Sequence, residues 1–243
     1  MLNLVFWGVA FFAALLGTIA AFGISSILLP VALLFFEFRT ALALVSIFHL
    51  AGNIGRITFF RSGVDLRFII KFGVPSVVFT FLGASLVTFV SQPVLRFVLG
   101  LVLMGYTFLS LFNPTLTLTP NRVNSVVGGA VYGFFAGLIG TGGPIRGAIL
   151  SAFRFKKSTY IATSGTISFF VDLTRVPVYL IGGFLTPPYY GHVPLLFLVA
   201  LTGAYTSTKL VTRITTTTFR VVIQCAIALI SLKLVYDGIQ ALV

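Results

Sequence analysis

Two arginines lie inside apolar stretches of the sequence, where a charged side chain is costly. Arg56 precedes the mostly apolar run 57–60, and Arg175 precedes a similar run, 176–179. An arginine in hydrocarbon is unfavourable by a few kcal/mol or more, so its guanidinium should face polar partners or a water-filled cavity. A planar guanidinium suits an oxygen-rich anion such as a sulfonate or a carboxylate. Both arginines are therefore predicted substrate ligands; the alternative is snorkelling, because each lies near a segment end.

Three further polar residues accompany these arginines. Asp172 precedes Arg175 by three residues, on the same helical face, and is either a structural ion-pair partner or a proton carrier. Asn53 has the matching position beside Arg56, and His49 lies about one helical turn before Asn53. We expect Asn53, Asp172 and His49 to line the same substrate site as the arginines. For His49, the alternative is a role in helix packing.

Two short apolar segments, 25–36 and 144–155, each follow a break in the apolar sequence. The N–H groups and the positive dipole end at the start of a short helix favour an anion. Arg146 is either part of this anion site or a residue at the cytoplasmic interface. The alternative for the breaks themselves is close helix packing through small residues. The break residues predicted to contact the anion are Ser25, Ser26, Gly142 and Gly143.

Residue patterns that would support other chemistries are missing from the sequence. Cys225 is the single cysteine and the chain has two histidines, so the sequence predicts no metal site and no cofactor. It contains no carboxylate pair, no Cys–His pair and no Gly-x-Ser-x-Gly motif, which argues against an enzyme. The absence of a Gly-x-x-x-x-Gly-Lys-[Ser/Thr] phosphate loop argues against an ATP-driven pump. The chemistry that these residues favour is anion binding.

The composition places these residues in a membrane protein. Of the 243 residues, 58% are hydrophobic and 8% are charged, whereas a soluble domain carries about a quarter charged residues. The net charge of +12 does not indicate nucleic-acid binding, because no Lys/Arg-rich run with interleaved aromatic residues occurs. Basic residues of a membrane protein gather in its cytoplasmic loops. We expect a multi-pass protein of the cytoplasmic membrane, in contact with the lipid bilayer; whether it forms a homo-oligomer is left open.

The polar side chains described above lie on apolar segments of the sequence. The number and length of these segments predict an all-α polytopic fold. The segments are 2–22, 25–36, 40–60, 67–90, 94–112, 124–140, 144–155, 159–182, 190–210 and 217–240. Segments 25–36 and 144–155 are about 18 Å long as helices, too short for a hydrocarbon core of about 30 Å. The polar stretch 113–123 contains two prolines and is predicted to link two transmembrane repeats, 1–112 and 124–243.

The two halves resemble each other at an offset of 119 residues, which places Arg56 on Arg175. Because each half has five segments, the second half should be inverted in the membrane. With both termini outside, ten Lys and Arg residues fall in cytoplasmic loops and two, Arg39 and Arg96, fall outside, as the positive-inside rule requires. Inverted repeats of this kind usually bind substrate near the membrane midplane. The loops predicted to be cytoplasmic are 61–71, 113–123 and 153–158.

The sequence around both breaks carries a recognisable pattern. The first half contains FGISSILLP at 22–30 and RTALA at 39–43. The second half contains GLIGTGGPIRG at 137–147, STYIATS at 158–164 and TRVPVYLIGG at 174–183. With these motifs the chain resembles, over nearly its whole length, the TauE/SafE family of sulfite and organosulfonate exporters. It departs from the family where Ser25 and Ser26 replace the usual glycine cluster.

The resemblance implies transport of a small sulfur-containing anion, sulfite or an organosulfonate, across the cytoplasmic membrane without ATP-binding subunits. The inverted repeats, the paired breaks and the two arginines within apolar segments favour a secondary transporter. We expect export by alternating access, with coupling to an ion left open. One alternative is an anion channel of the same fold, which belongs to a different functional class. The other is a transporter of the same fold that carries carboxylates.

Overall fold

The computed structural model describes residues 2–19, 25–60, 63–112, 119–153, 155–210 and 216–241, and within these ranges it is helical with no strand. The helices are α1 (Leu2–Ile19), α2 (Ser25–Ala32), α3 (Phe38–Phe59), α4 (Leu66–Phe68), a π-helical turn (Ile69–Gly73), α5 (Val74–Leu86), α6 (Gln92–Phe112), α7 (Arg122–Leu138), α8 (Gly143–Ala152), α9 (Lys157–Ile181), a 3-10 turn (Pro187–Tyr189), α10 (His192–Leu210) and α11 (Thr216–Gln240). Because α4, the π-helical turn and α5 are continuous, the described chain forms ten helical segments. This confirms the all-α fold predicted from the sequence.

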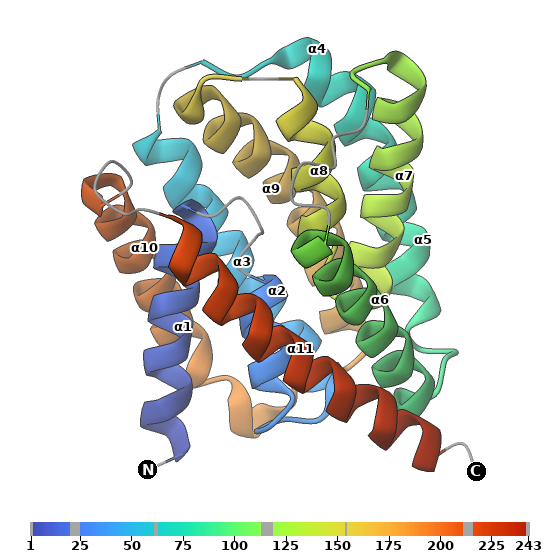
Figure 1. The fold of residues 1–243 in the computed structure, drawn as a ribbon. Helices are drawn as coiled ribbons and strands as arrows, with labels where there is room; N and C mark the ends of the chain where they lie inside the picture. The colour runs from blue at the N-terminus through green and yellow to red at the C-terminus, as the bar shows by residue number, and fades with distance from the viewer. Residues whose placement is uncertain are drawn as a thin grey trace.

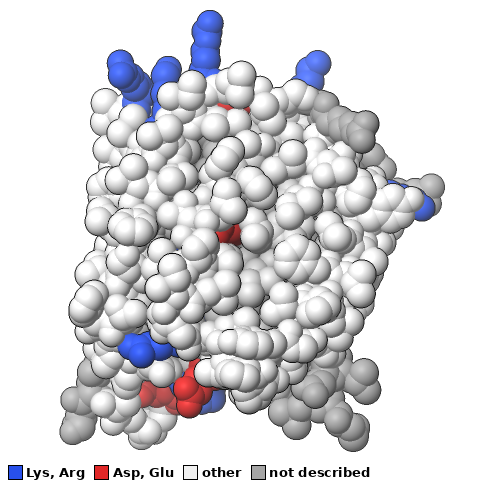
Figure 2. Space-filling view, turned by 180° about the vertical axis from the view of Figure 1, so that it is seen from behind, with Lys and Arg blue, Asp and Glu red and all other residues white. Residues whose placement is uncertain are grey.

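The outer surface of the bundle is apolar between two charged ends. Among the described residues, four helical runs are long and apolar enough to cross a membrane: Phe38–Phe59, Leu66–Leu86, Gln92–Leu109 and Pro187–Leu210. Figure 2 shows Lys and Arg side chains projecting from one end and charges of both signs at the other, with an almost uncharged band between them. A bilayer would surround this band, so the chain is a polytopic membrane protein.

Glycines allow α5 and α7 to approach closely. A Cβ at Gly133 would lie 2.0 Å from the backbone oxygen of Ser76, and one at Gly137 would lie 2.3 Å from that of Thr80. The hydroxyl of Thr80 donates a hydrogen bond to the carbonyl of Gly133 across the same interface, at 3.0 Å. Small residues at such positions are typical of helix packing in membranes. Helices α5 and α7 are therefore closely packed beside the polar centre described below.

The two short helices begin inside the bundle, and their starting points meet. Helix α2 has 8 residues and α8 has 10, so they are about 12 and 15 Å long and neither crosses a bilayer. Ser26, in the first turn of α2, forms a 2.8 Å hydrogen bond with Thr141, just before α8. The predicted segment 25–36 is helical only as far as Ala32, after which the chain turns. Residues 22–24 of the first break lie outside the described residues.

The helix directions place the chain ends together. Both termini lie at the lower end of Figure 1, whereas α4 and the starts of α7 and α9 lie at the upper end. Arg67 in α4, Arg122 at the start of α7 and Lys156 before α9 are exposed. These basic residues therefore lie at one end of the bundle, whereas the side of the membrane that this end faces and the inverted repeat stay predictions. Of the ten basic residues expected in cytoplasmic loops, Arg61, Arg154 and Arg213 lie outside the described residues.

Cysteine labelling tests this orientation. We expect cysteines introduced at positions 62 and 158, in a Cys225→Ser background, to react only with reagent that reaches the cytoplasmic side, because basic loops are retained there. The measurement is labelling of intact cells with a membrane-impermeant maleimide before and after permeabilisation, with a cysteine near the N-terminus as the external control. If positions 62 and 158 react from opposite sides, the inverted arrangement is wrong.

Candidate functional site

Helices α3 and α9 face each other through polar side chains in the middle of the bundle. On α3, His49, Asn53 and Arg56 have the spacing of one helical face, and on α9 Asp172 and Arg175 do the same. All five side chains are buried, with exposed fractions of 0–3%. The structure therefore brings together the five polar residues that the sequence predicted as one site, and it excludes snorkelling for both arginines.

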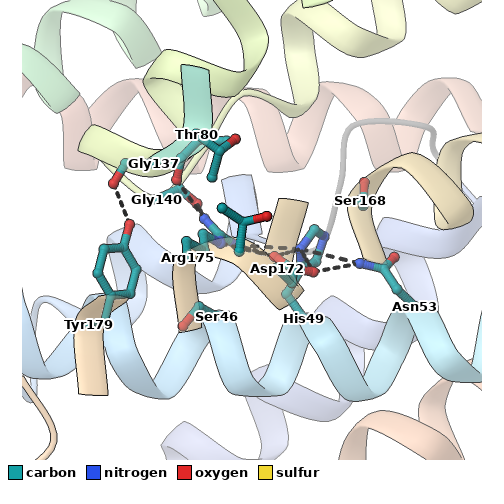
Figure 3. A network of polar contacts seen from close by, with 12 residues as sticks. Ser46, His49, Asn53, Thr80, Gly137, Gly140, Ser168, Asp172, Arg175 and Tyr179 are labelled. Atoms are coloured by element: carbon teal, nitrogen blue, oxygen red, sulfur yellow. Dashed lines mark hydrogen bonds and ion pairs between the residues drawn. The ribbon is translucent and has the colours of Figure 1, made fainter. Parts of the chain in front are cut away.

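Asp172 is the centre of this group (Figure 3). Its carboxylate accepts a 2.7 Å hydrogen bond from the side-chain amide of Asn53 and faces His49 Nδ1 at 2.9 Å. Arg175 donates through Nε at 2.9 Å and forms an ion pair through Nη2 at 2.8 Å. The structural ion pair considered from the sequence is thus present. With three partners around one carboxylate, the negative charge of Asp172 is fully engaged by neighbouring side chains.

Arg175 also closes the C-terminal end of α7. The last carbonyls of a helix lack partners within it, and Arg175 Nη1 donates to the carbonyls of Ala136 and Gly140 at 2.7 and 2.9 Å. One turn further along α9, the Tyr179 hydroxyl donates to the carbonyl of Gly137. Gly140 has a φ of +75°, which lets the chain turn after α7. The Asp172–Arg175 pair therefore connects α9 to the second break.

Arg56 occupies the other end of the α3 polar face. Its Nη1 donates a 3.2 Å hydrogen bond to the side-chain oxygen of Asn53, whose amide group binds Asp172. The stem of Arg56 packs on Gly165 of α9, where an added Cβ would lie 3.1 Å from the Arg56 Cβ. The α3 face therefore continues from the carboxylate to this second guanidinium.

A second polar cluster lies beside the first and contains Arg146 of α8. Arg146 has an exposed fraction of 1%, so the interpretation as a cytoplasmic-interface residue is wrong. Its Nη1 donates to the Tyr132 hydroxyl at 3.0 Å and contacts the Ser168 hydroxyl, and these two hydroxyls are 3.1 Å apart. The guanidinium also lies over the Tyr132 ring, 5.3 Å from its centre. Burial of this charge among neutral groups marks the cluster as a candidate anion contact.

The predicted break residues are all buried in the structure. Ser25 and Ser26 begin α2, and Gly142 and Gly143 begin α8. A Cβ at Gly142 would lie 2.7 Å from the backbone oxygen of Tyr132. Close packing thus accounts for glycine at position 142 without any ligand, and a bulkier residue there would disturb the fold whether or not an anion binds.

Sequence reasoning missed Tyr132, Ser168, Thr141 and Tyr179 as members of these clusters. One signal was available for two of them. Ser168, Asp172, Arg175 and Tyr179 have the spacing of a single helical face, so a polar stripe runs along the second half of α9. Thr141 lies within the break motif at 137–147, whereas Tyr132 carries no comparable local signal. Among the described residues, no group of three His, Cys, Asp or Glu side chains that could hold a metal ion occurs.

The apolar bundle, its buried polar centre and the paired helix breaks define a polytopic membrane protein that carries charged groups deep in its interior. The chain belongs to the sulfite exporter TauE/SafE family, whose sequence pattern matches residues 6–234. The resemblance noted from the break motifs is thereby confirmed, and the family is one of membrane transporters of sulfite-type anions. Comparisons with curated proteins and with solved structures found no match.

Proposed function

We propose that this protein is a secondary transporter that exports a small sulfur-containing anion, sulfite or an organosulfonate, across the cytoplasmic membrane by alternating access. The proposed binding site comprises the polar faces of α3 and α9 together with the starts of α2 and α8. Its members are Ser25, Ser26, His49, Asn53, Arg56, Gly142, Gly143, Asp172 and Arg175.

The balance of buried charge is the observation that carries this proposal. The chain has four carboxylates: Glu37 is exposed, Asp65 caps α4, Asp237 pairs with Lys233 at the surface, and Asp172 is buried. Three arginines, Arg56, Arg146 and Arg175, are buried among the described side chains. One buried carboxylate against three guanidinium groups leaves an excess of positive charge. Buried charge is costly unless it is compensated, and a bound anion would supply the compensation.

The position of the two breaks supports the same site. Arg175 donates a hydrogen bond to the carbonyl of Gly140, and the next residue along the chain, Thr141, is hydrogen-bonded to Ser26. Two hydrogen bonds and one peptide bond therefore connect the starts of α2 and α8 to the Asp172–Arg175 pair. Backbone N–H groups and positive dipole ends at helix starts favour an anion. Transporters with inverted repeats commonly bind substrate between such broken helices near the midplane.

Transport by reconstituted protein tests the proposal. We expect liposomes that contain the purified protein and are loaded with radiolabelled sulfite or an organosulfonate to show efflux that saturates with internal concentration. Flux that rises linearly without saturation would favour the anion channel instead. Preference for an acetate-like carboxylate over the matching sulfonate would favour the carboxylate transporter. If sulfur oxyanions neither bind nor cross, the proposed function is wrong.

Replacing Arg56 with alanine should weaken sulfonate binding by about ten- to a hundred-fold. The reason is loss of a charge-assisted contact worth about 1.5–3 kcal/mol. Isothermal titration calorimetry on purified protein measures the change. Arg122→Ala is the matched control, because Arg122 is exposed at the start of α7 and should not change the affinity. If Arg56→Ala folds and binds as the wild type does, Arg56 does not contact the substrate.

A further inference from the structure

The Arg146 cluster has unused capacity for hydrogen bonding. Arg146 binds Tyr132 and Ser168 through Nη1, whereas its buried Nε has no hydrogen-bond partner among the described residues. A buried donor without a hydrogen-bond partner is unfavourable, and a ligand oxygen could accept this hydrogen bond. One of the Tyr132 and Ser168 hydroxyls donates to the other, and the remaining O–H can turn toward an acceptor. The cluster thus presents several donors around one buried positive charge.

Arg56 lies close to this cluster. Its stem packs on Gly165, and Arg146 contacts Ser168, so both arginines reach the same turn of α9 from different helices. Gly165 and Ser168 are three residues apart and lie on the same side of α9, so both arginine side chains approach one face of this helix. Like charges repel, and the repulsion is stronger in an apolar interior than in water. An anion placed near both guanidinium groups would attract each of them and so offset the repulsion between them.

Asp172 does not fill that role for Arg146. Its two oxygens already bind Arg175, His49 and Asn53. The buried charges of the described side chains are three arginines and one carboxylate, an excess of two positive charges with His49 neutral. A ligand with a single negative charge would leave part of this excess, and a ligand with two would balance it.

From this geometry we propose that Arg56 and Arg146, with the hydroxyls of Tyr132 and Ser168, form an oxyanion subsite that selects doubly charged substrates. The inference rests on the proposed function and specifies its substrate class: the sulfite dianion, or a sulfonate that carries a second acidic group. A sulfonate with an amino group, which has no net charge, would bind more weakly. The Asp172–Arg175 pair positions α9 against α7 and leaves recognition of the second charge to Arg146.

Comparing two tetrahedral anions of similar size tests the effect of ligand charge while ligand shape stays nearly the same. Sulfate carries two negative charges and methanesulfonate carries one. We expect calorimetry on the full-length purified protein, at constant ionic strength, to show sulfate binding at least about tenfold more tightly, as one additional charge-assisted contact implies. Arg146→Gln should remove most of that preference while changing methanesulfonate affinity only a few-fold. Arg122→Gln is the matched control and should keep the preference.

The outcomes distinguish this inference from the proposed function. Equal affinity of the wild type for the two anions overturns the charge rule while leaving an anion transporter in place. A preference for sulfate that persists in folded Arg146→Gln overturns the assignment to Arg146. If no sulfur oxyanion binds, the proposed function fails and the subsite fails with it. The wild-type comparison needs no variant, so it decides the charge rule even if Arg146→Gln does not fold.

Discussion

Replacing Asp172 with asparagine is expected to lower the free energy of unfolding by about 3–5 kcal/mol, because removing one partner of a buried ion pair leaves the other charge uncompensated. Asparagine has nearly the same shape, so the loss would come from charge and not from a cavity. Arg175 would be left with neutral partners, and the link between α9 and the end of α7 would weaken. Thermal or chemical unfolding of the purified protein in detergent measures the effect.

The chain supplies a matched control for this substitution. Asp237 forms an ion pair with Lys233 on the exposed side of α11, and exposed pairs contribute about 0–1 kcal/mol. Asp237→Asn should therefore change the unfolding transition little. If Asp172→Asn is no more destabilising than Asp237→Asn, the buried ion pair does not hold α9 in place. Arg175→Ala should show a loss similar to that of Asp172→Asn, so reduced ligand binding by that variant alone would not identify Arg175 as a substrate ligand.

Substituting Gly133 with alanine should be strongly destabilising, by about 1–3 kcal/mol or more, since the new methyl group would overlap the backbone of α5. The Cβ would lie 2.0 Å from the carbonyl oxygen of Ser76, and a backbone atom cannot rotate away as a side chain can. The two helices would have to separate. We expect a lower melting temperature and a smaller yield of monodisperse protein in size-exclusion chromatography.

Gly105 in the middle of α6 provides the comparison, because a Cβ there would meet no atom within 4 Å. Alanine is a better helix former than glycine by about 1 kcal/mol, so Gly105→Ala should be neutral or stabilising. Equal melting temperatures for the Gly133→Ala and Gly105→Ala proteins would mean that α5 and α7 are not in the close contact seen here.

The cluster around Asp172 and Arg175 differs from the cluster around Arg146 in the hydrogen-bond partners of its arginine. Arg175 is surrounded by acceptors from the protein itself, whereas Arg146 has hydroxyls and an unused donor beside it. A group whose partners are satisfied is suited to holding helices together. A positive group with neutral neighbours is better suited to receiving a charged ligand. Within the proposed site, the Asp172–Arg175 pair therefore also holds α9 against α7, whereas Arg146 has a donor available for a substrate.

The sequence alone was enough to predict the helices and several members of the site. Long apolar segments and the turn residues between them depend on local composition, and each predicted segment corresponds to a helix with ends shifted by a few residues. The pairing of Asp172 with Arg175 was also accessible, because residues three apart on a helix share a face. His49, Asn53 and Arg56 were recognisable as polar residues at helical spacing in an otherwise apolar stretch.

Only the tertiary structure decided which of these residues meet across helices. The contact of Asp172 with His49 joins positions 123 residues apart, and the bond between Ser26 and Thr141 spans 115 residues. The burial of Arg146 beside Tyr132 and Ser168 likewise depends on how α8 fits between α7 and α9. Hydropathy and helical spacing determine which face of a helix is polar, but the partner of that face is set by packing of side chains over the whole bundle, such as the close approach that Gly133 permits. That packing is a property of the assembled helices, which is why local patterns could indicate the charged groups without indicating their partners on other helices.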